Sequence, residues 1–370
     1  MRSETRKVQQ VGHSTLMVSL PKDWVIATGL SPGETLTIQR DDNQILHILP
    51  VGSLEKKEIL KCILDADKCD KKGLLTRIIT GIYIIGYETL EITSTKGFSD
   101  ENMTEIRNVI QHLTGMNIVD ENANELVIKN FVDPTRFPTN GLLRRLYIIT
   151  SWMQDASIKG LKERKRSILT EAINMENEVD RLYRLVVRQL LLAVRDKSIE
   201  KKLGVESSMN IVGDRTVAKV LEKIGDLAEE IAKEVLLIIE NEQKIDKKVI
   251  EDLEQMFKQT HDVFEISMKG FFSTDINESN EAIERINNIR LTRKKVRESI
   301  LSRFRKSLTN GNESDLSTIS AYLSLNTIII NLEQISTFTS TISEIAINRA
   351  VEKENDLLKI QKVATSDSLT

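Results

Sequence analysis

Apolar side chains recur every three or four positions through the second half of the chain, a spacing typical of helices that bury one face. The clearest case is Arg215–Ile239, where Val217, Leu221, Ile224 and Ala228 begin one stripe. The same spacing predicts six long helices joined by short polar connections. They are Asn140–Leu161, Ile168–Val194, Arg215–Asn241, Lys247–Ser273, Asn277–Leu308 and Asp315–Val351.

The order of these helices indicates an internal repeat. Helices this long with short connections favour antiparallel bundles, here two three-helix bundles over residues 140–242 and 247–351. The third helix can be superimposed on the sixth and the second on the fifth, which predicts a duplication. The superimposed pairs are Glu222 with Glu333, Asp226 with Thr337, Glu176 with Glu284 and Asp180 with Asn288.

Residues 4–50 show a different pattern of short alternating runs and turn residues. RKVQQV and STLMVSLP are predicted strands around Gly12-His13, and KDWVIATG is a predicted short helix. After a turn at Pro32-Gly33, ETLTIQR and QILHILP flank an acidic turn and predict a hairpin. A unit this short buries little surface alone, so we expect it to pair with a second copy or to pack on the rest of the chain.

Between these regions the sequence predicts a small α+β unit over residues 60–131, while the charged stretch 54–72 is expected to be helix or linker. The proline-containing stretch 133–138 marks the boundary with the bundles. The chain is therefore predicted to be mainly α, with an N-terminal β domain. The middle elements are helices Leu74–Ile85 and Ser99–Leu113 and strands TLEITS, Asn117–Val119 and Glu125–Phe131.

Composition supports long helices and limits the partners. The chain is 40% apolar, 29% charged and only 4% aromatic, which disfavours a sandwich or barrel. Its formal net charge of -3 gives no global field for nucleic acid, so any DNA contact has to be local. No apolar run is long enough to span a membrane, and Cys62 and Cys69 lack zinc-site spacing. We expect a cytoplasmic protein with reduced thiols.

The candidate chemistry lies in carboxylates at helical spacing. Glu222, Asp226 and Glu230 follow each other in steps of four, and Glu176 and Asp180 repeat that step on the preceding helix. Stacked like charges repel by a few tenths of a kcal/mol per pair, and a cation would offset that cost. Oxygen ligands suit hard cations such as Mg, Ca or Mn, or iron in an oxygen-rich site.

A plainer interpretation stays open for the same residues. The acids could form a solvated helix face on which Lys223, Lys233 and Arg184 act as ion-pair partners. Gly225 lies among them at a cost of about 1 kcal/mol in a helix, which indicates that something approaches the backbone closely there.

The N-terminal order resembles the AbrB/SpoVT/MazE swapped-hairpin domain. The shared points are strand–glycine–strand ending in Leu20-Pro21-Lys22, a helix, Pro32-Gly33-Glu34, and a hairpin. The resemblance implies an intertwined homodimer that binds DNA through Arg2, Arg6, Lys7 and Lys22. Because basic and acidic residues are equal in number over residues 1–50, a dimerisation module without DNA contact is the alternative.

The helical region resembles the PhoU family, whose members contain two three-helix bundles. The family's metal motif is an acid, three residues and an aspartate, often in Glu-Arg-Ile-Gly-Asp. Here Glu222-Lys223-Ile224-Gly225-Asp226 and Glu176–Asp180 match it, with lysine in place of arginine. The resemblance implies a metal site formed by Glu176, Asp180, Glu222, Asp226 and Glu230. It also implies that zinc or iron, besides Mg and Mn, is among the possible metals.

Together these features predict a phosphate-responsive regulator of phosphate uptake that binds DNA through its N-terminal domain. The resemblance also implies contact with a phosphate transporter or a signalling protein, so a transport regulator without DNA binding is one alternative. A metal-storage protein or metal-dependent enzyme is another. We expect no enzyme, because no Gly-rich phosphate loop occurs and the histidines fall in different units.

Overall fold

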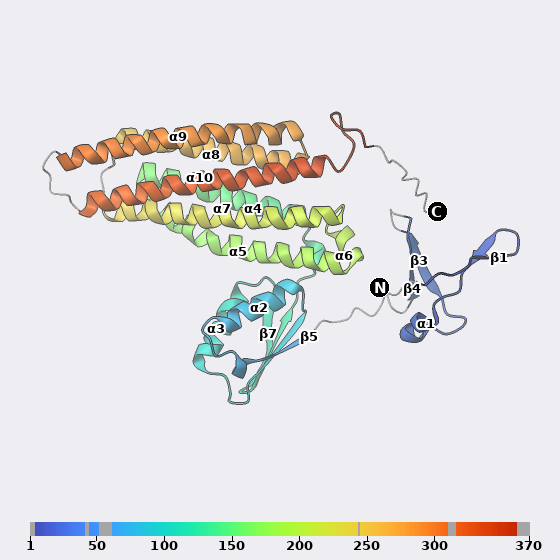
Figure 1. The fold of residues 1–370 in the computed structure, drawn as a ribbon. Coiled ribbons are helices and arrows are strands. Elements are labelled where there is room, and N and C mark those ends of the chain that lie inside the picture. Colours follow the sequence, from blue (N-terminus) through green and yellow to red (C-terminus); the bar gives the residue numbers. More distant parts are fainter. Residues whose placement is uncertain (1–3, 41–43, 52–60, 243–244, 310–315, 361–370) are drawn as a thin grey trace. The chain divides into compact units, whose positions relative to one another are not determined.

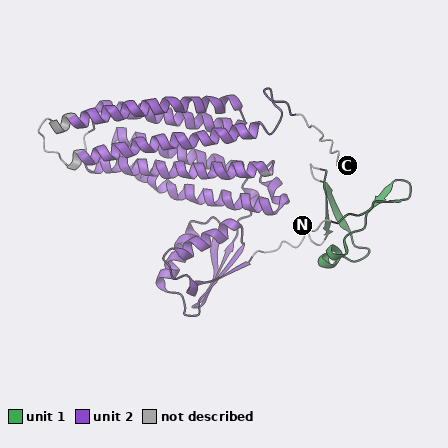
Figure 2. Ribbon diagram, viewed as in Figure 1, with its two compact units in different colours: residues 1–60 green, residues 61–370 purple. Residues whose placement is uncertain are grey.

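The computed structural model describes residues 4–40, 44–51, 61–242, 245–309 and 316–360 (Figure 1). The chain divides into two compact units, residues 1–60 and 61–370 (Figure 2). The predicted class is confirmed: short N-terminal strands precede a mainly helical region. Among the described residues, no helix combines the length and apolarity that crossing a membrane requires.

The N-terminal unit consists of two separate antiparallel hairpins and one short helix. The first hairpin pairs Gln9 with Met17, and the second pairs Leu36 with Pro50. The first strand of the unit, at Gln9–Val11, is shorter than the predicted run RKVQQV. None of the described residues of this unit is buried. The elements are β1 (Gln9–Val11), β2 (Thr15–Met17), α1 (Lys22–Thr28), β3 (Leu36–Arg40) and β4 (Leu46–Pro50).

The second unit begins with a four-stranded sheet in the order β5-β6-β8-β7. Strands β5 and β6 are parallel, and the other neighbours are antiparallel. The expectation of helix or linker over 54–72 was wrong for Lys61–Asp65, which forms β5. The elements are β5 (Lys61–Asp65), η2 (Ala66–Lys68), α2 (Leu74–Ile85), β6 (Thr89–Thr93), α3 (Asp100–Gln111), β7 (Met116–Glu121) and β8 (Glu125–Asn130).

A buried arginine joins this α+β region to the first bundle. Leu75, Ile79 and Tyr83 of α2 pack in a core with the inner face of the sheet. The Arg188 side chain on α5 (Arg166–Arg195) donates hydrogen bonds to the main-chain oxygens of Tyr83, Gly86 and Tyr87 at and just after the end of α2. Gly86 and Tyr87 follow the last residue of α2, and the guanidinium supplies a donor to their carbonyls. It supplies a second donor to the Tyr83 carbonyl, which also accepts from the Gly86 amide at 3.1 Å. Burial lowers the pKa of Arg188.

The long helices form two three-helix groups around one continuous apolar core (Figure 1). α4, α5 and α7 make the first bundle, α8, α9 and α10 the second, and α7 also packs along α10. The helices are α4 (Thr139–Glu163), α5 (Arg166–Arg195), α6 (Lys197–Lys202), α7 (Ser208–Glu240), α8 (Lys247–Ser273), α9 (Ile276–Thr309) and α10 (Leu316–Ala350), preceded by η3 (Pro134–Arg136).

The helix α7 starts earlier than predicted. The predicted start at Arg215 left Gly213 and Asp214 in a connection, but both residues lie inside the helix. Its first turn is capped by the Ser207 hydroxyl, which accepts a hydrogen bond of 3.2 Å from the Asn210 amide. Asp214 accepts a hydrogen bond of 2.6 Å from Arg349 of α10. This tertiary ion pair holds the segment helical despite its glycine.

Candidate metal centre

Gly225 sets the distance between α7 and its neighbours. A Cβ atom at this position would lie 2.9 Å from Val179 Cγ1 on α5 and 3.5 Å from Thr150 Cγ2 on α4. The close approach predicted from the glycine is therefore confirmed. Because Val179 precedes Asp180 and Gly225 precedes Asp226, the contact point places acids of both helices next to each other.

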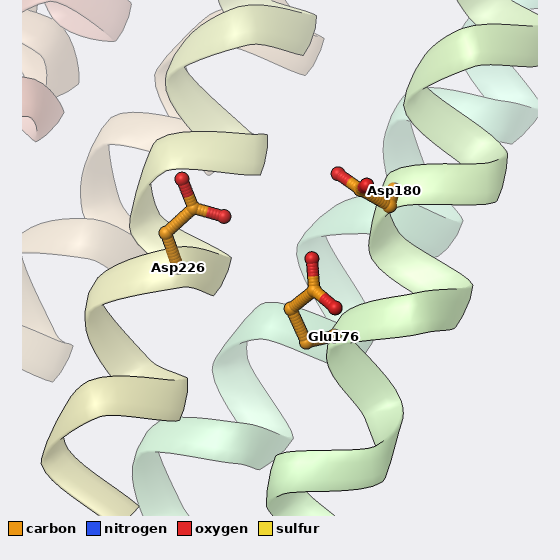
Figure 3. A group of neighbouring side chains, drawn as sticks. All are labelled: Glu176, Asp180 and Asp226. Atoms are coloured by element: carbon orange, nitrogen blue, oxygen red, sulfur yellow. The ribbon is translucent and has the colours of Figure 1, made fainter. Parts of the chain in front are cut away.

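Three carboxylates converge at this point. Glu176 and Asp180 of α5 and Asp226 of α7 direct their side chains into the space between the two helices (Figure 3). One oxygen from each lies within 4.8 Å of the others, and all three residues are half-buried. Metal–oxygen bonds of 2.0–2.6 Å separate opposite ligands by about 4–5 Å. The donor set therefore fits a hard divalent cation.

Two of these acids have basic partners on their own helices. Asp180 accepts from Arg184, and Asp226 accepts from Lys223 at 2.5 Å. Among the described residues, no basic side chain forms an ion pair with Glu176. Both the cation-site and the ion-pair interpretations of the sequence thus describe part of the geometry.

The electrostatic strain of the cluster falls on Glu176. Its pKa is raised from 4.5 to about 7, first by burial and then by the charges of Asp180, Glu229 and Asp226. Arg184 opposes the increase only in part. The sequence reasoning missed Glu229, because it followed steps of four; a step of three from Asp226 reaches it on the same face.

The remaining two candidate ligands point elsewhere. Glu222 is only 7% exposed and accepts from Lys219 at 2.7 Å, whereas Glu230 is exposed and accepts 3.0 Å from Asn331 of α10. Four residues rotate a helix by about 40° beyond a full turn, so Glu222 and Glu230 diverge by about 80°. The structure does not bring either into the group of three.

The second bundle carries no matching cluster among its described residues. Burial on α10 follows the predicted overlay on α7, with Ser336 at the place of Gly225. On α9 the buried positions shift the overlay by one residue, so that Ile286 corresponds to Val179. Ile283, Asn287 and Thr337 then replace the three acids, and Glu333 pairs with Arg293.

The N-terminal basic candidates are spread around the first strand and helix. Arg2 lies outside the described residues. Arg6 forms an ion pair with Glu4, Lys7 is exposed just before β1, and Lys22 is exposed at the first residue of α1.

The two helical bundles, with an acidic cluster on the first, are similar to the PhoU domain. Residues 143–235, which span the helices of the first bundle, match the PhoU domain family, and residues 9–56 match the MazE family of bacterial antitoxins, described as antidote-toxin recognition. The predicted joining of a swapped-hairpin-type segment to a PhoU-like region is confirmed.

A curated relative and two solved structures are similar to the chain. The phosphate-specific transport system accessory protein PhoU homolog 2 of Thermotoga maritima is 27% identical over 166 residues, 44% of this chain but 65% of that protein, less than two thirds of its length. The PhoU structure from Pseudomonas aeruginosa matches with a TM-score of 0.50 at 13% identity, covering 58% of this chain and 95% of that one, and shows a shared fold. The phosphate transport system regulatory protein PhoU from Streptococcus pneumoniae matches at 0.46, with 17% identity over 59% and 96% of the two chains.

Proposed function

We propose that the protein is a cytoplasmic, phosphate-responsive regulator of phosphate uptake, with a DNA-binding N-terminal unit and a metal-binding first bundle. The cluster of Glu176, Asp180 and Asp226 carries this proposal, because it lies within the segment that matches the PhoU domain. The name of the Thermotoga maritima relative, an accessory protein of phosphate transport, supports the pathway. Its description as an accessory protein supports a non-enzymatic function here.

The pairing of two copies is supported by the exposed apolar surface of the N-terminal unit. Its described part buries no residue, while large apolar side chains remain exposed, among them Leu16 at 71% and Ile26 at 68%. Burying one such side chain contributes about 1.5–3 kcal/mol, so a second copy that covers these surfaces would stabilise both. The two unconnected hairpins leave strand edges on which a second copy can pair.

The three acids would hold the cation, and their chemistry favours Mg or Mn over Fe or Zn. The ion would supply positive charge between clustered carboxylates that otherwise repel each other. Ligand binding that shifts α5 against α7 would be coupled to the paired N-terminal units through the chain. A transporter or signalling protein is the partner that the bundles would contact.

A regulator of a phosphate transporter without DNA contact is the second candidate. The equal number of basic and acidic residues in 1–50 favours it, since phosphate contacts supply most non-specific DNA affinity. In that protein the N-terminal unit would serve only to join two copies.

Gel shifts with DNA upstream of phosphate-transport genes separate the two candidates. We expect a sequence-preferring shift that weakens as salt rises above about 100 mM, and a salt slope that falls by about one for each lost phosphate contact in Lys7→Gln or Lys22→Gln. Lys258→Gln on α8 is the matched control. A shift that neither N-terminal variant changes, or no shift at all, would favour the transporter regulator.

A further inference from the structure

A row of cations continues the acidic cluster along the same two helices. Arg215, Lys219 and Lys223 follow each other in steps of four on α7, and Tyr183 of α5 faces the first two. The Tyr183 ring centroid lies 5.2 Å from the guanidinium carbon of Arg215 and 5.1 Å from Lys219 Nζ. Basic side chains gathered at a half-buried aromatic ring are a geometry in which an oxyanion can be bound.

Two of these three cations, and Arg184 beside them on α5, form ion pairs with acids of the same two helices. Lys219 pairs with Glu222 at 2.7 Å, Lys223 pairs with Asp226, and Arg184 pairs with Asp180. No carboxylate among the described residues forms an ion pair with the half-buried Arg215. The row therefore contains one cation that is available, Arg215. The partner of Lys223 is a candidate metal ligand, and the partner of Lys219 lies beside the cluster.

The surface made by these side chains, here called the α5–α7 seam, is electrically balanced. Its carboxylates and its basic side chains are equal in number. The carboxylates are Glu176, Asp180, Glu222, Asp226 and Glu229, and the basic side chains are Arg184, Arg215, Lys219, Lys223 and Lys233. A divalent cation on the three clustered acids would leave the seam with two excess positive charges, the charge that a phosphate dianion neutralises.

We propose that the α5–α7 seam binds a phosphate-type oxyanion at Arg215, Lys219 and Lys223, and does so only when the acidic cluster holds a cation. This inference rests on the metal site of the proposed function. When the cation binds Asp180 and Asp226, Arg184 and Lys223 have to share these carboxylates with the cation. The two basic side chains can then donate hydrogen bonds to the oxyanion. Without the cation, each carboxylate keeps its basic neighbour and competes with the anion.

The second bundle offers an internal comparison, because the three clustered acids and the row of cations are both missing there. Under the register set by burial, Asn326, Ile330 and Gln334 stand at the places of Arg215, Lys219 and Lys223. Leu291, which is 62% exposed, stands in place of Arg184. A bundle can thus form without the three clustered acids and without the row of cations. Neither set is needed for helix packing, and the two sets occur together in the first bundle.

Calorimetric titration of the full chain with inorganic phosphate tests the proposal, first with stoichiometric Mn²⁺ and then with a chelator. We expect saturable phosphate binding with Mn²⁺ and a loss of at least about tenfold in affinity without it. Arg215→Gln breaks no ion pair, and it should weaken phosphate binding about tenfold or more while Mn²⁺ binding stays unchanged. Arg290→Gln, on the exposed face of α9, is the matched control and should change neither.

The outcomes separate the two proposals. Absence of Mn²⁺ binding to the wild-type chain would refute the metal site and this inference together. Binding of Mn²⁺ with neither phosphate binding nor vesicle binding, or with equal binding of these ligands under chelator or in Arg215→Gln, would refute the oxyanion site alone. Flotation with vesicles containing phosphatidylglycerol identifies the source: vesicle binding that needs Mn²⁺ and Arg215, without inorganic phosphate binding, would assign a lipid headgroup.

Discussion

Replacing Glu176 by glutamine removes one charge from the most crowded point of the acidic cluster. Burial and three neighbouring acids raise the Glu176 pKa from 4.5 to about 7. A pKa raised in the folded state means that the proton stabilises folding. That stability is complete below about pH 4.5 and is lost as the pH rises to about 7 and above.

The size of this loss follows from the pKa difference. A difference of about 2.5 pH units corresponds to about 3.4 kcal/mol as an upper bound. Because the Glu176 side chain is only half-buried, solvent screening reduces the expected value to about 1–2 kcal/mol. At pH 8 with a chelator, Glu176→Gln should therefore be more stable than wild type by that amount, or by roughly 2–3 °C in melting temperature for a unit of this size.

Urea unfolding at pH 5 and pH 8 measures the effect. Most of the difference should disappear at pH 5, and Glu171→Gln, an exposed residue on the same helix, should show none at either pH. Added Mn²⁺ should stabilise wild type more than Glu176→Gln, since a ligand stabilises the state that binds it. A Glu176→Gln variant no more stable than wild type at pH 8 would refute the crowding argument.

Other variants test the packing around the cluster. Gly225→Ala should destabilise the protein by about 1–3 kcal/mol in urea, less any gain in helix propensity, because the new Cβ would lie 2.9 Å from Val179. It should also weaken Mn²⁺ binding by moving α5 from α7. Arg188→Ala should cost about 1–3 kcal/mol by removing the buried donor of the Gly86 and Tyr87 carbonyls, seen as faster amide exchange at the end of α2. Leu16→Asp should convert a dimer into a monomer in light-scattering measurements.

Elements set by local signals could be predicted from the sequence. The predicted ranges of α2 and α8 match the structure, because Gly73 and Gly86 flank α2 and a left-handed Thr274 ends α8. Strand β5 could not be predicted in the same way. It is five residues long within a charged stretch, and its identity comes from parallel pairing with β6, which lies more than twenty residues further along.

The sequence predicted that carboxylates of α5 and α7 form the candidate site, but it did not predict which of them lie together. Steps of four indicated the acids of α7, yet the rotation of the helix leaves only Asp226 facing Glu176 and Asp180. Glu229 of α7 acts through its charge, which raises the pKa of Glu176 on α5. The spacing of residues along one helix does not show such a contact with another helix. The α9 overlay missed by one residue because charge spacing was matched there instead of burial.

The helix α7 packs against helices of both bundles, so a cation bound at its acidic cluster would be able to influence α10. One face of α7 carries Asp226 toward α5, while Glu230, one turn later, accepts a 3.0 Å hydrogen bond from Asn331 of α10. Ordering of α7 by a cation should therefore slow amide exchange on α10 around Asn331. Asn331→Ala should keep Mn²⁺ affinity and lose most of that slowing, whereas Asn326→Ala should keep both. Equal slowing in Asn331→Ala and wild type would show that the bundles communicate through their apolar core, without this hydrogen bond.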